Sequence, residues 1–137
     1  MNMNLATFEN HFWELSSGEE AHRENPDTFW IPDLRDRQSL KVGDSARLIF
    51  EIEGYGDNDE IEIIGERMNV IVSEIIGDFY IGILDHQPAI IDPEDDFYLG
   101  YGVEVPFKAE HVINITRPPE DYIKWQLGQK PEKLWSR

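Results

Sequence analysis

The chain has 137 residues, with 28 Asp and Glu residues against 12 Lys and Arg residues, so its formal net charge is −16. This length favours a single domain, and 40% hydrophobic residues with 4 Trp, 5 Tyr and 7 Phe supply enough apolar surface for a folded core. The acidic balance argues against nucleic acid and anionic membranes as partners, and the absence of Cys excludes disulfides and thiolate metal sites.

The first part of the chain, residues 1–40, is predicted to form an N-terminal helix and a loop. Apolar side chains recur at helical spacing over residues 7–15, and Thr7 is a residue type that caps helix N-termini. The polar residues 18–27 are predicted to form a surface loop.

The central part, residues 41–116, is predicted to form a β core, because its apolar residues recur at every second position. Strands are expected at residues 45–52, 67–76, 79–85, 103–107 and 111–115. The side chains expected in the core are Leu48, Phe50, Val70, Val72, Ile81, Ile83, Val105 and Ile113. Short strands separated by turns predict an α+β protein with a small, strongly bent antiparallel sheet or partly open β-barrel and short terminal helices.

Turn residues refine this prediction. Gly77 and Asp78 form a two-residue connection that is typical of a tight hairpin. Pro106 indicates an edge strand, because proline cannot donate to the ladder. The alternation of Ile61 and Ile63 predicts a strand extension beyond the acidic turn at residues 54–59.

The last part, residues 117–137, is predicted to form a C-terminal helix and a tail. Pro119 and the acidic residues after it are typical of a first helical turn, and Gly128 should end the helix. Residues 129–137 are expected to fray.

The negative charge is concentrated in two segments. Residues 51–66 contain seven Asp and Glu residues and no Lys or Arg, and residues 85–104 contain six and no Lys or Arg. Tyrosines adjoin both segments, and aromatic side chains beside carboxylates are typical of a surface that binds a basic protein. The candidate partner-binding residues are Tyr55, Asp57, Asp59, Glu60, Asp95, Asp96, Tyr98 and Tyr101. The alternative is that the aromatic residues close one end of the barrel.

A second candidate is a ligand site at Asp85 and His86, where an acid and an imidazole follow a predicted strand. The alternative is ordinary turn chemistry before a proline. Calcium-loop templates that start at Asp57 or Asp92 fail, because Glu62 and Phe97 occupy the glycine position. We therefore expect no metal, no cofactor and no catalytic residue.

Three stretches of the β core resemble the YegJ-like family of small bacterial domains of unknown function. They are Gly65-Glu-Arg-Met-Asn-Val-Ile-Val72, Gly77-Asp-Phe-Tyr-Ile-Gly-Ile-Leu-Asp-His-Gln-Pro88, and Gly102-Val-Glu-Val-Pro-Phe107 followed by Glu110-His-Val-Ile-Asn-Ile115. The resemblance covers roughly residues 40–116 and implies a compact bacterial β-rich domain, with no catalytic residue carried over. The chain departs from the family pattern at Asn69 and His86.

Three functions fit these observations. The first is a non-enzymatic module whose acidic face binds a protein partner, for example an immunity protein that blocks a basic toxin. The second is a small-molecule or metal-dependent enzyme that uses His86 and nearby carboxylates. The third is a domain of a larger assembly, in which the charge serves only solubility. The first residues lack the basic and apolar regions of a signal peptide, so we expect a cytoplasmic protein.

Overall fold

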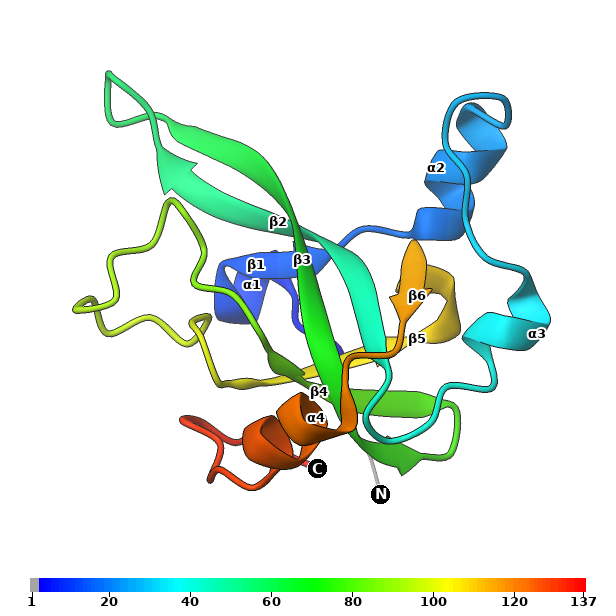
Figure 1. The fold of residues 1–137 in the computed structure, drawn as a ribbon. Coiled ribbons are helices and arrows are strands. Elements are labelled where there is room, and N and C mark those ends of the chain that lie inside the picture. Colours follow the sequence, from blue (N-terminus) through cyan, green and yellow to red (C-terminus); the bar gives the residue numbers. More distant parts are fainter. Residues whose placement is uncertain (1–2) are drawn as a thin grey trace.

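A computed structural model describes residues 3–137 (Figure 1). Its helices are α1 (Phe8–His11), α2 (Gly18–Glu24), α3 (Leu34–Arg37) and α4 (Glu120–Leu127), with the 3₁₀ helix η1 (Ala109–His111). The strands are β1 (Trp13–Leu15), β2 (Ser45–Tyr55), β3 (Ile61–Ile76), β4 (Phe79–Leu84), β5 (Glu104–Lys108) and β6 (Asn114–Thr116). The longest helix of residues 3–137, α4, has eight residues, and none of these helices could cross a membrane.

All the strand pairs are antiparallel, in the order β1-β2-β3-β4-β5. β1 pairs with residues 50–52 of β2 and β6 pairs with residues 45–47, so both lie on the edge of β2 opposite β3. The sheet curls strongly into a half-barrel (Figure 1). The predicted α+β fold with a bent antiparallel sheet is confirmed.

Alternation along the strands builds the core. Leu48 and Phe50 of β2 point to the same side of the sheet as Val70 of β3, and all three are fully buried. The predicted core residues Leu48, Phe50, Val70, Val72, Ile81, Ile83, Val105 and Ile113 are each at most 6% exposed. Burial of each such side chain stabilises the fold by about 1.5–3 kcal/mol.

The predicted hairpin turn and the predicted edge strand are confirmed, but one strand begins later in the chain than predicted. Gly77 takes a left-handed φ of 60° and connects Ile76 to its partner Phe79. Pro106 lies on β5, the last strand in the order of the sheet. The strand predicted at residues 111–115 begins only at Asn114, because η1 occupies the preceding turn.

The β2–β3 hairpin extends beyond the rest of the sheet. β1 stops pairing at Ile52, whereas β2 and β3 remain paired as far as Tyr55 and Ile61. We call residues 53–63 the hairpin arm; Figure 1 shows it projecting at the upper left. The predicted strand extension through Ile61 and Ile63 is therefore confirmed as the start of β3.

The prediction of one helix over residues 7–15 was wrong in its second half. Thr7 does cap a helix, since its hydroxyl accepts from Asn10 N–H at 3.3 Å, but Phe12 takes a left-handed φ of 68° that ends α1. The chain then forms β1, in which Trp13 lies opposite Ile52. Burial against the sheet overrides the helical spacing here.

The loop predicted at residues 18–27 was also wrong, because α2 occupies most of it. Ser17 caps this helix by accepting from Glu20 N–H at 3.1 Å. A Ser followed three residues later by Glu is a known signature of a helix start, so the signal was present in the sequence.

The C-terminal helix is as predicted, but the expected fraying of the tail is wrong. α4 follows Pro119 and ends at Gly128. Trp135 is buried and its Nε1 donates to the carbonyl of Asn4 at 2.8 Å. Arg137 pairs with the buried Glu104 at 2.5 Å. A buried carboxylate requires a partner, which the tail supplies.

Candidate functional site

The hairpin arm carries the first group of predicted partner-binding residues. Tyr55 is 80% exposed at the end of β2, and Asp57, Asp59 and Glu60 are exposed in the turn that follows. Asp59 takes a left-handed φ of 59°, a conformation that Asp and Asn adopt more readily than most residues. The turn therefore presents its carboxylates to solvent at the far end of the arm.

The two faces of the arm differ. On one face, Ile64 and Gly54 lie next to Ile90, which approaches within 3.8 Å of the position that a Gly54 side chain would take. On the opposite face, Tyr55 pairs across the strands with Ile61, and Ile63 follows two residues later. Within residues 3–137, only the first face is covered by another segment.

The second acidic segment is a long loop that joins β4 to β5; we call residues 85–103 the acidic loop. The Glu66 carboxylate of β3 accepts from the backbone N–H groups of Ala89 and Ile90, at 3.1 and 3.3 Å. These bonds hold the loop against the hairpin. Asp95 and Asp96 lie further along the loop and are exposed, and Lys133 approaches Asp96 only to 3.9 Å.

Tyr98 does not share this exposure. Its ring stacks on Trp13 with an interplanar angle of 10°, and its hydroxyl donates to the carbonyl of Glu104 at 2.7 Å. Burial is the main cause that raises the Tyr98 pKa. The Tyr98 ring is thus packed against the core instead of projecting into solvent beside Asp95 and Asp96. Tyr101 is 37% exposed, and its hydroxyl accepts from Gln126 at 3.2 Å.

Asp85 and His86 are not arranged as a pair. An Asp85 carboxylate oxygen accepts from the Tyr122 hydroxyl at 2.5 Å and from Gln126 Nε2 at 2.8 Å, which attaches α4 to the end of β4. Burial, followed by the bond to Asp85, raises the Tyr122 pKa. His86 is exposed in the acidic loop. Within residues 3–137, no group of three or more His, Asp or Glu side chains is placed to hold a metal ion.

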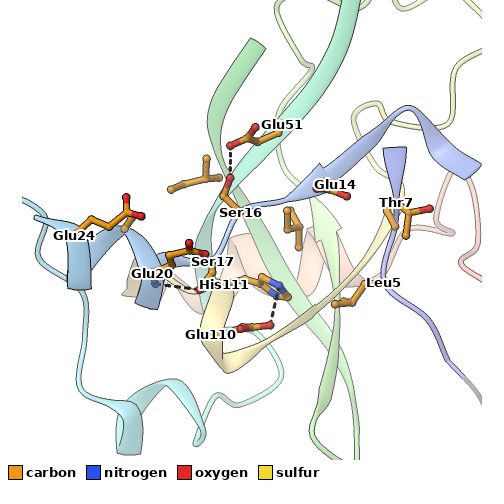
Figure 2. Close-up of a pocket in the computed structure, with 14 residues that line it drawn as sticks. Leu5, Thr7, Glu14, Ser16, Ser17, Glu20, Glu24, Glu51, Glu110 and His111 are labelled. Atoms are coloured by element: carbon orange, nitrogen blue, oxygen red, sulfur yellow. Dashed lines mark hydrogen bonds and ion pairs between the residues drawn. The ribbon is translucent and has the colours of Figure 1, made fainter. Parts of the chain in front are cut away.

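A further acidic feature was not predicted. A cavity of about 730 Å³ lies between β1, α2 and η1 (Figure 2). Its carboxylates are Glu14, Glu20, Glu24, Glu51 and Glu110, and its described lining residues include no Lys or Arg. They come from four separate elements, β1, α2, β2 and η1, so no local sequence pattern indicated them.

Several of the polar groups that line the cavity already have partners. The Ser16 hydroxyl donates to Glu51, and His111 Nδ1 accepts from Lys108 N–H at 2.9 Å. His111 Nε2 then carries the hydrogen and lies 3.5 Å from Glu110 (Figure 2). The imidazole thus has no free lone pair to act as a general base. The cavity is a recess lined by carboxylates, with no Lys or Arg among its described lining residues.

Basic residues pair with carboxylates elsewhere in the molecule. Arg137 pairs with Glu104, Arg37 with Glu19 at 2.7 Å, and Arg117 with Asp44 at 3.1 Å. The arm carboxylates are Glu53, Asp57, Asp59, Glu60 and Glu62. The ion pairs found within residues 3–137 involve none of them.

Comparison of the chain with protein-family models, with curated proteins and with solved structures finds no match. The resemblance to the YegJ-like family stays a prediction.

Proposed function

We propose that the protein is a non-enzymatic interaction module that binds a basic protein through its hairpin arm and acidic loop. An immunity-type inhibitor that covers a basic toxin is one concrete form of this function. The proposal is supported above all by the five arm carboxylates, which form no ion pair with any residue from 3 to 137, although other carboxylates pair with arginine.

The physical argument concerns what unpaired exposed charge can do. Exposed carboxylates contribute little to folding, so their concentration on one projecting hairpin stabilises nothing inside the molecule. A concentrated field of one sign attracts a partner of the opposite sign and raises the association rate. The acidic loop is hydrogen-bonded to the hairpin through Glu66, and the exposed Asp95 and Asp96 belong to the same loop.

The experiment begins with the native host. The full chain would be used to retain a partner from host extract, a neighbouring gene for a toxin-like protein would be sought, and the identified partner would be purified. Association and dissociation rates would then be measured at increasing salt. Because the Debye length is about 8 Å at 0.15 M, the association rate should fall steeply over that range.

A charge variant tests which carboxylates act. Changing Asp57, Asp59, Asp95 and Asp96 together to Asn should lower the association rate by at least about tenfold and leave the fold intact. The control variant removes the same charge elsewhere, by changing Asp27, Asp33, Asp36 and Asp121 to Asn, and should keep the association rate near that of the wild type. Equal rates for both variants would contradict the proposal. A metal-dependent activity lost in His86→Ala would favour the enzyme alternative instead.

A further inference from the structure

Three large apolar side chains stand exposed on one face of the hairpin arm. Tyr55 is 80% exposed, Ile61 is 64% exposed and Ile63 is 48% exposed. The register places Tyr55 opposite Ile61, and Ile63 two residues along the same strand, so all three project from the same face. We call these three residues the apolar row.

No other part of residues 3–137 covers this face of the arm. Ile90 of the acidic loop packs near Gly54 and Ile64 on the other face. Beyond the apolar row, the next residue of the same face on β3 is Gly65, where an added Cβ would meet no atom within 4 Å. The row therefore borders a stretch of strand at Gly65 that no side chain of residues 3–137 covers.

Solubility and hairpin stability do not explain the row. A need for solubility would account for the carboxylates, but it works against exposed isoleucine. A cross-strand pair that stabilises the ribbon accounts for Tyr55 and Ile61. It does not account for Ile63, whose cross-strand partner is Glu53.

We propose that the apolar row is the anchor of the interaction surface and enters an apolar patch that Lys and Arg residues surround on the partner. This inference rests on the proposed function and names the residues that hold the complex together. Charge complementarity selects a basic partner, because Glu53 pairs with Ile63 on the face of the row and the carboxylates of the turn lie between Tyr55 and Ile61 in the chain. It disfavours a second copy of the chain, whose own acidic arm would be repelled.

In this arrangement the charged residues and the apolar row affect different steps of binding. Carboxylates at the rim of an interface act mainly on the association rate, whereas buried apolar anchors act mainly on dissociation. Truncation of the row should therefore leave the salt dependence of association in place and shorten the lifetime of the complex.

The test uses two capped peptides of equal charge, one alternating Arg with Leu and the other alternating Arg with Gly. Each is titrated into the full chain at low salt, and binding is followed by the NMR signals of the isoleucine methyl groups. We expect the Leu-containing peptide to bind at least about tenfold more tightly and to shift the Ile61 and Ile63 methyl signals.

The variant pair is Ile63→Thr and Ile75→Thr. Both isoleucines lie on β3 and are 48% exposed, but Ile75 lies at the other end of the strand. Threonine keeps the β-branched shape, so both variants should keep the sheet, which backbone amide shifts would verify. Ile63→Thr should remove most of the advantage of the Leu-containing peptide, and Ile75→Thr should keep it.

The outcomes separate this inference from the proposed function. If both peptides bind equally, or if the shifts lie away from the arm, charge recognition stands and the apolar row is not its anchor. If neither peptide binds at low salt, the proposed function itself fails. A dimer of the wild-type chain in sedimentation that Ile63→Thr dissociates would assign the row to a second copy and overturn the proposal.

Discussion

At the scale of single residues, the buried His111 makes the stability of the fold depend on pH. Its side chain is buried, and burial followed by the nearby Lys108 lowers its pKa to about 4, although Glu19 acts in the opposite direction. Protonation would also place a hydrogen on Nδ1, which already accepts from Lys108 N–H. The folded protein therefore holds this imidazole neutral.

The consequence is a loss of stability in mild acid. In the unfolded chain the histidine takes up a proton near its ordinary pKa of 6.5, so the unfolded state binds more protons as the pH falls toward 4. We expect this residue to account for a loss of about 2 kcal/mol of unfolding free energy between pH 7 and pH 5. Urea denaturation at the two pH values would measure it.

The matched variant for this measurement is His111→Gln, because its amide oxygen can accept the same backbone bond without titrating. The variant should lose less stability than the wild type over the same pH interval. Parallel losses in the two proteins would show that other groups, and not His111, control the acid response.

At the scale of elements, two strand glycines should respond in opposite ways to alanine. A Cβ on Gly82 of β4 would lie 2.5 Å from Val70 Cγ2, whereas a Cβ on Gly65 of β3 meets no atom within 4 Å. Gly82→Ala should cost about 1–3 kcal/mol through overpacking. Gly65→Ala should stabilise by about 0.5 kcal/mol, because alanine restricts the unfolded chain. Thermal unfolding of both variants checks this, and equal effects would contradict it.

The central strands could be predicted because one periodic signal governs them. In β2 the side chains that alternate in sequence are also those that the sheet buries. In β4 the alternating residues Ile81 and Ile83 are buried as well, although their neighbours Tyr80 and Leu84 are buried too. Gly77 fixes the register of the β3–β4 hairpin. β1 could not be predicted in this way, because three residues carry too short a pattern. Trp13 is buried through contacts with distant segments, among them Phe50 of β2 and Tyr98.

The candidate site could be predicted only in part. Carboxylate counts locate the arm and the acidic loop, and Tyr55 lies exposed on the arm. Period-two alternation at Ile61 and Ile63 predicts a strand, but it cannot tell whether another element covers its apolar face. Tyr98 is the opposite case: it was predicted to be exposed in a binding surface but is packed on Trp13. This contact joins segments that are far apart in the sequence, so no local pattern indicates it.

At the scale of the whole molecule, the net charge of −16 opposes folding through self-repulsion. Two acidic segments contain thirteen of the 28 carboxylates, and the arm carboxylates form no ion pair within residues 3–137. The free protein thus retains repulsion that a basic partner would relieve on binding. The same carboxylates therefore lower the stability of the free protein and favour the binding of a basic partner.

This opposition gives a prediction for the variant in which Asp57, Asp59, Asp95 and Asp96 are changed to Asn. At about 0.01 M salt, where the Debye length is about 30 Å, the variant should melt a few degrees above the wild type. Asn tolerates the left-handed φ at position 59 as well as Asp does, so the turn should be kept. The difference should vanish near 1 M salt, where screening acts within about 3 Å.

The control variant at Asp27, Asp33, Asp36 and Asp121 should show a smaller rise in melting temperature, because Asp36 already lies 3.7 Å from Arg35. A lower melting temperature for the arm and loop variant would instead mean that these carboxylates stabilise the fold. Their presence would then be explained by stability, without a role in recognition.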